Sequence, residues 1–195
     1  GIVISFYYQD AQKDLRFDDY DARQAAYWSL LEGAFGHTYG HNSIWQMWAP
    51  GREPVIGANI PWYDAIDHAG GFQMKHVRRL FESRPYQLLE PRPDFLLDGP
   101  NSGGAKVKVA RASDGSFAFV YSPRGEQFTI DQSMIDSDQV RAYWYDPRYG
   151  TSSFIHEGDN TGPQTFTPPS SGRGQDWMLV LDDGTKNFPD PGKKE

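Results

Sequence analysis

The stretch VKVARASDGSFAFVY, residues Val107–Tyr121, has the pattern of a β-hairpin. Val107 and Val109 alternate with lysines, and Phe117, Phe119 and Tyr121 alternate on the returning side. Between the two halves, the run Ser113-Asp114-Gly115 has the composition of a tight turn. We therefore predict two antiparallel strands in this stretch, and with them an all-β region.

Five further short segments downstream have strand character, and each is bounded by Pro, Gly or Asp. They are Gln127–Ile130, Val140–Tyr145, Ser152–His156, Gln164–Thr167 and Asp176–Leu181. Short strands at such spacing are typical of an antiparallel β-sandwich. Trp144 and Trp177 fall in these alternating patterns, which favours core packing over exposed sugar platforms.

The N-terminal part has a different rhythm, of strands alternating with helices. The expected elements are a strand over Gly1–Tyr8, a helix over Tyr20–Glu32, a strand from His37 leading into a loop that reaches Gln46, and helices over Trp62–His68 and Ala69–Glu82. This order is found in parallel barrels and doubly wound sheets. Asp18, Asp19, Asp21 and Arg23 are expected to cap the first helix and to form a surface ion pair, in preference to a catalytic role.

Two regions are therefore predicted, a βα segment over residues 1–90 and a β-sandwich over residues 91–195. Pro91, Pro93, Pro100 and the Gly103-Gly104 pair mark the expected junction. The fold class is α+β, and the polar tail from Asp182 is expected to be loosely held.

Composition limits the partners. The formal net charge is -7, so no general attraction to nucleic acid or to an anionic membrane is expected. The chain has no cysteine, which excludes disulfides, thiolate zinc sites and cysteine nucleophiles. The apolar run Gly1–Tyr8 is too short for a membrane span and lacks the features of a signal peptide, so we expect it to form a strand. Because the sequence starts inside this strand, we expect a processed product or a piece of a longer protein.

The densest group of functional side chains is GHTYGHNSIWQ, Gly36–Gln46. Aromatic rings stack on the apolar faces of sugars, while His, Asn and Gln match sugar hydroxyls. The candidate substrate-binding residues are His37, Tyr39, His41, Asn42, Trp45 and Gln46. Two alternatives stay open: a buried core strand whose polar groups satisfy one another, and a metal site using His37 and His41, for which no third ligand is evident.

Several motifs resemble those of the apiosidase-like glycoside hydrolases. The resemblance covers roughly residues 15–190 and rests on five segments: Tyr20–Trp28, Gly36–Gln46, Ser83–Pro85, Trp144–Arg148 and Gly172–Trp177. It implies the last units of a (β/α)8 barrel followed by the family's C-terminal β-sandwich, a module named for collagen binding. Gly36–Gln46 would then lie at the eighth strand and its following loop, on the face where barrel active sites lie.

This chain departs from the family pattern at the positions of the two catalytic carboxylates. The resemblance places the acid/base before Gly1, and Ser5 stands where the nucleophilic glutamate is expected, if Tyr8-Gln9 matches the family's Tyr-Glu pair. Serine cannot replace that carboxylate in a double displacement. The catalytic residues are thus unknown, although any pair among Asp10, Asp14, Asp18, Asp19 and Glu53 would revive activity if it converged on the motif. No cofactor is expected.

The resulting hypothesis is a carbohydrate-active protein that retains part of a sugar site and takes part in polysaccharide degradation only if carboxylates are supplied. The alternative is a non-catalytic module that binds polysaccharide or collagen. The expected partner is a glycan, and the resemblance implies a secreted or periplasmic location. Because a quarter of a barrel leaves strand edges and apolar helix faces uncovered, we expect the N-terminal segment to pack on its own sandwich or to form a homo-oligomer.

Overall fold

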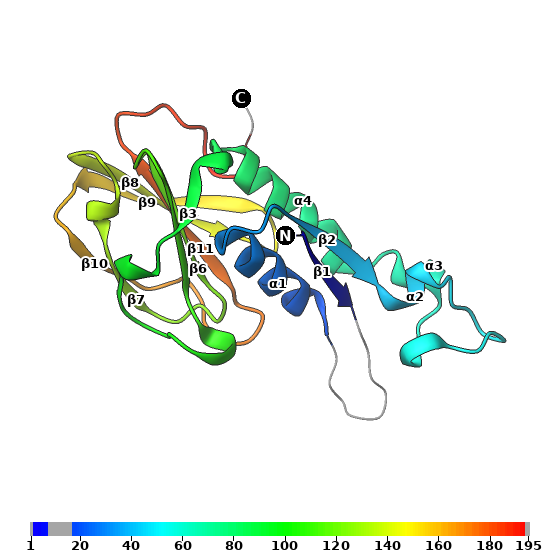
Figure 1. Cartoon of the computed structure of the whole chain (residues 1–195). Helices are drawn as coiled ribbons and strands as arrows, with labels where there is room; N and C mark the ends of the chain where they lie inside the picture. Colours follow the sequence, from blue (N-terminus) through cyan, green and yellow to red (C-terminus); the bar gives the residue numbers. More distant parts are fainter. Residues whose placement is uncertain (1, 8–16, 194–195) are drawn as a thin grey trace.

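The computed structural model describes residues 2–7, as backbone, and residues 17–193 (Figure 1). The chain begins with a parallel βαβ unit made of β1 (Ile2–Tyr7), α1 (Asp19–Leu31) and β2 (Gly36–His41). The two strands pair in register from Ile2 opposite Gly36 to Tyr7 opposite His41. Both strands therefore end at the same edge.

Helix α1 begins where the acidic residues of the sequence predict. The Asp18 carboxylate accepts hydrogen bonds from the backbone N–H groups of Tyr20 (2.9 Å) and Asp21 (3.4 Å), and the Asp21 side chain accepts one from Asp18 N–H (2.9 Å). This reciprocal capping box satisfies N–H groups that a helix leaves without partners. The predicted capping role is confirmed.

A lobe of short elements, residues 42–68, separates β2 from the second long helix. It contains α2 (Asn42–Trp45), the 3-10 turn η1 (Val55–Gly57) and α3 (Trp62–Ala65), and leads into α4 (Ala69–Glu82). Helices α1 and α4 pack against each other. The predicted helices are confirmed, but α2 replaces the expected loop after β2.

The remaining strands form the predicted sandwich, with a six-stranded sheet in the order β3-β5-β6-β11-β8-β9 and a three-stranded sheet in the order β10-β7-β4. All pairings within both sheets are antiparallel. The bounds are β3 Leu89–Pro91, β4 Leu96–Asp98, β5 Lys108–Ala112, β6 Phe117–Ser122, β7 Phe128–Asp131, β8 Gln139–Asp146, β9 Thr151–Asp159, β10 Pro163–Phe166 and β11 Trp177–Asp183. Short 3-10 turns η2 to η5 lie at Tyr86–Leu88, Pro93–Phe95, Gly103–Ala105 and Gln132–Met134. The expected junction therefore contributes β3 and β4 to the sheets.

The six-stranded sheet is buried on both faces, so strand β6 is buried at every residue. One face packs on the three-stranded sheet through residues such as Val120, Phe128 and Leu179. Trp144 joins this core, as predicted, with 7% of its surface exposed, and Trp177 packs against it while partly buried.

Helices α1 and α4 cover the other face of that sheet (Figure 1). Tyr27 of α1 stacks on Tyr121 of β6 with ring centroids 4.9 Å apart, and Phe81 of α4 meets Phe119 edge-on at 5.4 Å. Leu80 is completely buried in the same cluster. The N-terminal segment thus packs on its own sandwich, and the molecule has three layers, helices on a sheet on a sheet.

One expectation for this region is wrong. Arg23 does not form a surface ion pair, because only 1% of its side chain is exposed. Its guanidinium bonds the carboxylate of Asp176, with Nη2 to Oδ1 at 2.8 Å, and also contacts Asp19. Periodicity cannot show that a partner 153 residues away lies over the helix and takes this side chain out of water.

No helix among the described residues is long and apolar enough to cross a membrane.

Candidate functional site

The candidate site lies beyond the carboxyl ends of β1 and β2, where the 42–68 lobe begins (Figure 1). Ligands of parallel α/β folds bind at this edge, because the connections that follow the strands gather there. Asn42, Trp45 and Gln46 belong to the start of the lobe, whereas His37, Tyr39 and His41 belong to β2 itself.

Tyr39 lies on the side of β2 that faces α4. A Cβ placed on Gly70 would lie 3.2 Å from Cε2 of the Tyr39 ring, and one on Gly71 would lie 3.4 Å from Cε1. The two glycines therefore let the helix approach the ring. His37 and His41 alternate onto the same side of the strand, while Thr38 is exposed on the other. The structure thus places His37, Tyr39 and His41 on one side of β2. That side faces the helix layer.

His41 ends the strand and caps the short helix that follows. Its Nδ1 accepts a hydrogen bond from Ser43 N–H (3.1 Å), so Nε2 carries the proton and donates it to His68 Nδ1 (3.0 Å). The side chain is only 4% exposed. Burial, with a smaller electrostatic contribution from His68, lowers the pKa of His41 to about 4. His41 is therefore neutral at pH 7.

Asn42 and Gln46 hold the lobe together. Asn42 Nδ2 donates to the carbonyl oxygen of Ile56 (2.8 Å), and Gln46 Nε2 donates to that of Val55 (3.0 Å). Gln46 Oε1 in turn accepts a hydrogen bond from Val55 N–H (2.8 Å). Both amides thus fix the segment around η1 against α2, which gives the lobe its shape.

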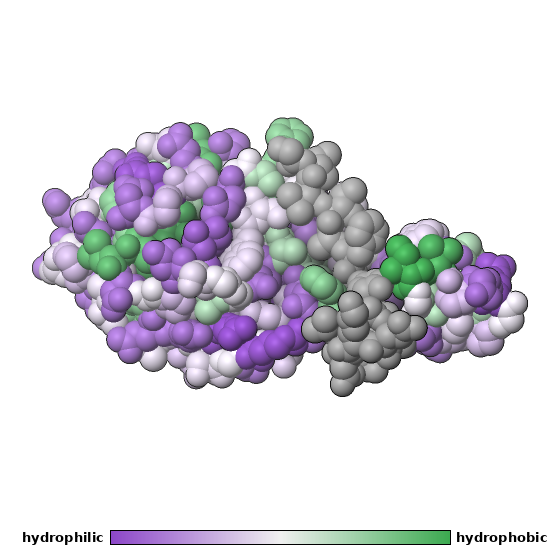
Figure 2. All heavy atoms as spheres, turned by 60° about the horizontal axis from the view of Figure 1, so that its bottom comes forward, coloured by the Kyte–Doolittle hydropathy of each residue, from purple (hydrophilic) through white to green (hydrophobic). Residues whose placement is uncertain are grey.

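Trp45 is the most exposed of the predicted residues, with 52% of its surface accessible. It shares the lobe with other exposed apolar side chains, Met47, Val55, Ile56, Tyr63 and Ile66. Figure 2 shows apolar surface on this lobe. An accessible indole on a frame held by Asn42 and Gln46 has the form of a stacking platform for an apolar face of a ligand.

Metal binding finds no further support in the described residues, where no group of three or more His, Asp or Glu side chains is placed to hold an ion. His68, which sequence reasoning missed, is the partner of His41. It stands 27 residues away just before α4, and no local pattern singles it out.

The acidic residues of the lobe, Glu53, Asp64 and Asp67, are all exposed. A glycosidase acid needs an environment that raises its pKa, and burial is the usual means. Asp10 and Asp14, together with the Tyr8-Gln9 pair, lie outside the described residues, and Ser5 is described only as backbone paired with Tyr39.

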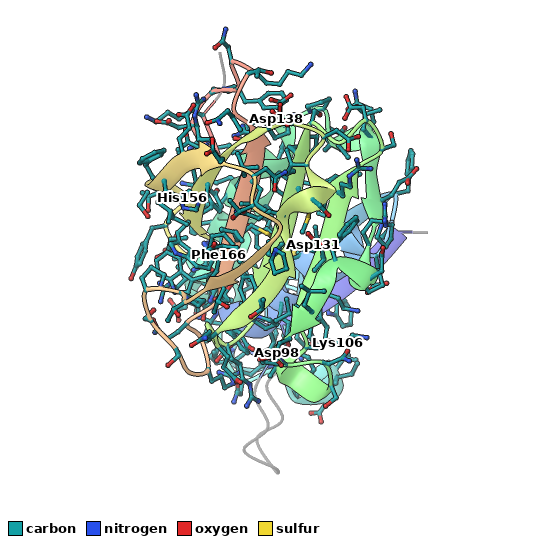
Figure 3. The ribbon with its side chains drawn as sticks, turned by 90° about the vertical axis from the view of Figure 1, so that its left-hand side faces the viewer. Asp98, Lys106, Asp131, Asp138, His156 and Phe166 are labelled. Atoms are coloured by element: carbon teal, nitrogen blue, oxygen red, sulfur yellow. The ribbon has the colours of Figure 1, made fainter. Side chains whose placement is uncertain are left out.

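The sandwich offers a second surface, the outer face of β4, β7 and β10 (Figure 3). Thr129 and Thr165 share a hydrogen bond there (2.9 Å), and Asp98 and Asp131 lie on the same sheet. At its edge, His156 stacks on Phe166 with ring centroids 6.2 Å apart. This surface is polar and partly acidic.

Comparison with known families matches both parts of the chain. Residues 5–87 match the family model described as "Apiosidase-like, catalytic domain". Residues 91–182 match the one described as "Putative collagen-binding domain of a collagenase". The resemblance inferred from the motifs is therefore confirmed. No match is found among curated proteins.

Two solved structures share the fold along almost the whole chain. One, titled "Glycoside hydrolase", is 34% identical with a TM-score of 0.85, over 91% of this chain and 40% of its own. The other, a glycoside hydrolase family 5 protein from Bacteroides vulgatus, is 30% identical with a TM-score of 0.84, over 92% and 39% respectively. The chain thus spans about two fifths of the length of these relatives.

Proposed function

We propose that this chain, which pairs part of an apiosidase-like catalytic domain with a collagen-binding-like domain, forms one side of a glycan-binding site and hydrolyses glycosidic bonds only when carboxylates from outside it are supplied. The match of residues 5–87 supports the link to glycosidic bonds. The shared end of β1 and β2 supports the location of the site, because barrel active sites form at that face.

The observation that carries the proposal is the exposed indole of Trp45 on a lobe held by internal hydrogen bonds. The side-chain amides of Asn42 and Gln46 are hydrogen-bonded to the backbone of Ile56 and Val55, so the platform is ordered before a ligand binds. A preformed stacking surface loses little conformational entropy on binding a sugar ring. In this proposal Trp45 makes the main contact, and the other predicted residues shape the site.

For the described residues of the lobe, the chemistry of glycosidases supports a requirement for outside carboxylates. Glycosidases use a carboxyl pair about 5 Å apart when they retain configuration, and roughly 6.5–9.5 Å apart when they invert it. One member of the pair must stay protonated near neutral pH, and glycosidases usually achieve this by burying it. Glu53, Asp64 and Asp67 are exposed, so we assign none of them this role.

The test is incubation of the pure protein with a panel of plant and microbial glycans, followed by product analysis. We expect binding without release of sugar. Robust hydrolysis that disappears when one of the chain's own acids, such as Glu53, is changed to Gln would contradict the requirement for outside carboxylates.

A second candidate function is a binding module, supported by the match of residues 91–182 and by the uncovered face of the three-stranded sheet (Figure 3). Helices α1 and α4 occupy one face of the six-stranded sheet, so polysaccharide or collagen would have to use the outer sheet. Pull-down on insoluble collagen and on polysaccharides is the test. A lack of retention on all of them would count against this function.

The resemblance also supports a secreted or periplasmic location, which the coding sequence upstream would test. Pairing of two copies along the open edges of β1 and β2 is a further proposal, because other described strands do not extend this sheet. Light scattering tests it, with a dimer as the expected result and a monomer as the contrary one.

A further inference from the structure

A basic groove lies at the carboxyl end of α4, beside the C-terminal segment. It consists of two adjoining hollows of about 730 and 630 Å³, which share Glu82 and Lys193 in their walls. Lys75, Arg78, Arg79 and Gly192 complete the first hollow, and Tyr86 and Gln87 belong to the second. The part of α4 that lines the groove runs from Lys75 to Glu82, about 10 to 20 Å along the helix from His68 and the candidate site.

The C-terminal wall of the groove is fixed in place. Gly192 N–H donates to Ser83 Oγ (3.2 Å), and the Arg84 guanidinium lies over the Phe188 ring at 4.9 Å. Gly192 has φ of 82°, and a Cβ there would lie 2.7 Å from a ring atom of Tyr145. The close approach therefore needs glycine, and the expectation of a loosely held tail is wrong for residues 188–193.

The groove concentrates positive charge on a chain whose net charge is -7. Arg78 pairs with Glu82 (2.6 Å) and Lys193 with Asp190 (2.7 Å). Among the described residues, no carboxylate forms an ion pair with Lys75 or Arg79, and both side chains are exposed. These two cations are one helical turn apart, a spacing at which like charges destabilise an isolated helix.

Helix stability alone does not account for these cations. A basic side chain in the last turn offsets the negative end of the helix dipole, and Arg79 is placed to do so. Lys75 is a full turn further from that end, where the effect has faded. Lys75 and Arg79 instead flank the hollow from the same side of the helix, where an anion would relieve their repulsion.

We propose that this groove binds an acidic glycan, with its carboxylate or sulfate group held by Lys75, Arg79 and Lys193 and a sugar ring stacked on Tyr86. The Tyr86 ring is 51% exposed, which leaves it available for stacking. The choice of a glycan over other polyanions rests on the proposed function. The groove is separate from the 42–68 lobe, so it would hold a chain of acidic sugars outside the site of hydrolysis.

Calorimetric titration of the whole protein with four probes tests the proposal: oligogalacturonate, a sulfated chondroitin oligosaccharide, a neutral xylo-oligosaccharide and polyglutamate. We expect one of the two acidic glycans to bind, more tightly than the other three probes and more weakly as salt is added. Because the chondroitin probe carries both groups, binding of oligogalacturonate identifies carboxylate recognition, and binding of the chondroitin probe without oligogalacturonate identifies a requirement for sulfate. No binding of either, or equal binding of polyglutamate, would overturn the proposal.

Substitutions of groove residues test whether the acidic glycan binds in the groove. The double variant Lys75→Gln with Arg79→Gln should weaken the acidic glycan at least tenfold, and Tyr86→Ala should weaken it without a matching effect on polyglutamate. The control, Arg92→Gln with Lys106→Gln, removes the same charge elsewhere and should leave the affinity unchanged. An equal loss in the control would contradict the proposal. Because binding is measured without turnover, these outcomes do not depend on whether the 42–68 lobe supports hydrolysis.

Discussion

Arg23 of α1 and Asp176, which directly precedes β11, form a buried ion pair that joins the helical layer to the sandwich. The Arg23 Nε and Nη2 atoms bond the carboxylate at 3.1 and 2.8 Å, and Tyr121 Oη donates a third hydrogen bond to it (3.0 Å). Although burial opposes it, the carboxylates of Asp176 and Asp19 raise the pKa of Arg23. Both members of the pair belong to motifs that carry the family resemblance.

Removal of the Asp176 charge should destabilise the whole molecule. In Asp176→Asn, Arg23 loses its main counter-charge in a site with no solvent access, so the free energy of unfolding should fall by about 3–5 kcal/mol. The same change in the exposed Arg92–Asp94 pair, Asp94→Asn, should cost less than about 1 kcal/mol. Urea unfolding measures both. Equal losses of unfolding free energy in the two variants would contradict a larger contribution from the buried pair.

The helical layer and the sandwich should unfold as one unit, because α4 packs on the six-stranded sheet. Leu80→Ala opens a cavity at that contact and should cost about 2–5 kcal/mol, with Leu97→Ala, at an exposed position, as the control. Hydrogen exchange should report the same loss in α4 and in β6. Loosening of α4 while β6 kept its protection would mean that the sandwich folds without the helices.

The burial of His41 next to His68 predicts a loss of stability in mild acid. His41 has a folded pKa of about 4, below its value of 6.5 in the unfolded chain, so between these pH values the unfolded state takes up a proton that the folded state does not. Stability should therefore fall as the pH drops from 6.5 to about 4. His41→Asn keeps a helix cap but cannot titrate, and its unfolding free energy should vary less over that range. An unchanged pH dependence would contradict this role.

Alanine substitutions at Gly125 and Gly174 distinguish the energetic cost of a steric clash from that of backbone strain. Both have positive φ, 60° and 79°, but a Cβ on Gly125 would lie 1.9 Å from Ser170 O, whereas one on Gly174 meets no atom within 4 Å. Gly174→Ala should cost about 1–2 kcal/mol from strain alone. Gly125→Ala should cost at least about 2 kcal/mol more, as measured by thermal unfolding. Similar losses of stability in the two variants would mean that the loop around Ser170 moves away from the added Cβ at little energetic cost.

The sequence predicted the elements well because their signals are local. Alternation along Val107–Tyr121 and the apolar face with Val77 and Phe81 specify a strand pair and a helix whatever lies beyond them. The family motifs supplied the remaining order of the fold. The packing of the N-terminal segment on the sandwich was one of the two arrangements expected from the need to cover apolar helix faces.

Side-chain partners could not be predicted in the same way. Arg23 has the composition of a surface helix residue, and only the distant Asp176 makes it a buried one. His37 and His41 have the spacing of a pair of metal ligands. Tyr39, on the same side of the strand, lies against Gly70 of α4, so that side faces the helix layer. Strand spacing gives the shared side of His37, Tyr39 and His41 but not whether that side meets helices or solvent.

An NMR titration of the ¹⁵N-labelled protein with neutral plant oligosaccharides, following the indole N–H of Trp45, is the most direct test of glycan binding by the 42–68 lobe. We expect saturable shifts at Trp45 and along residues 42–68, no shifts there in Trp45→Ala, and no sugar released. Shifts confined to the sandwich, or no shift with any glycan tested, would contradict the claim that this lobe forms one side of a glycan site.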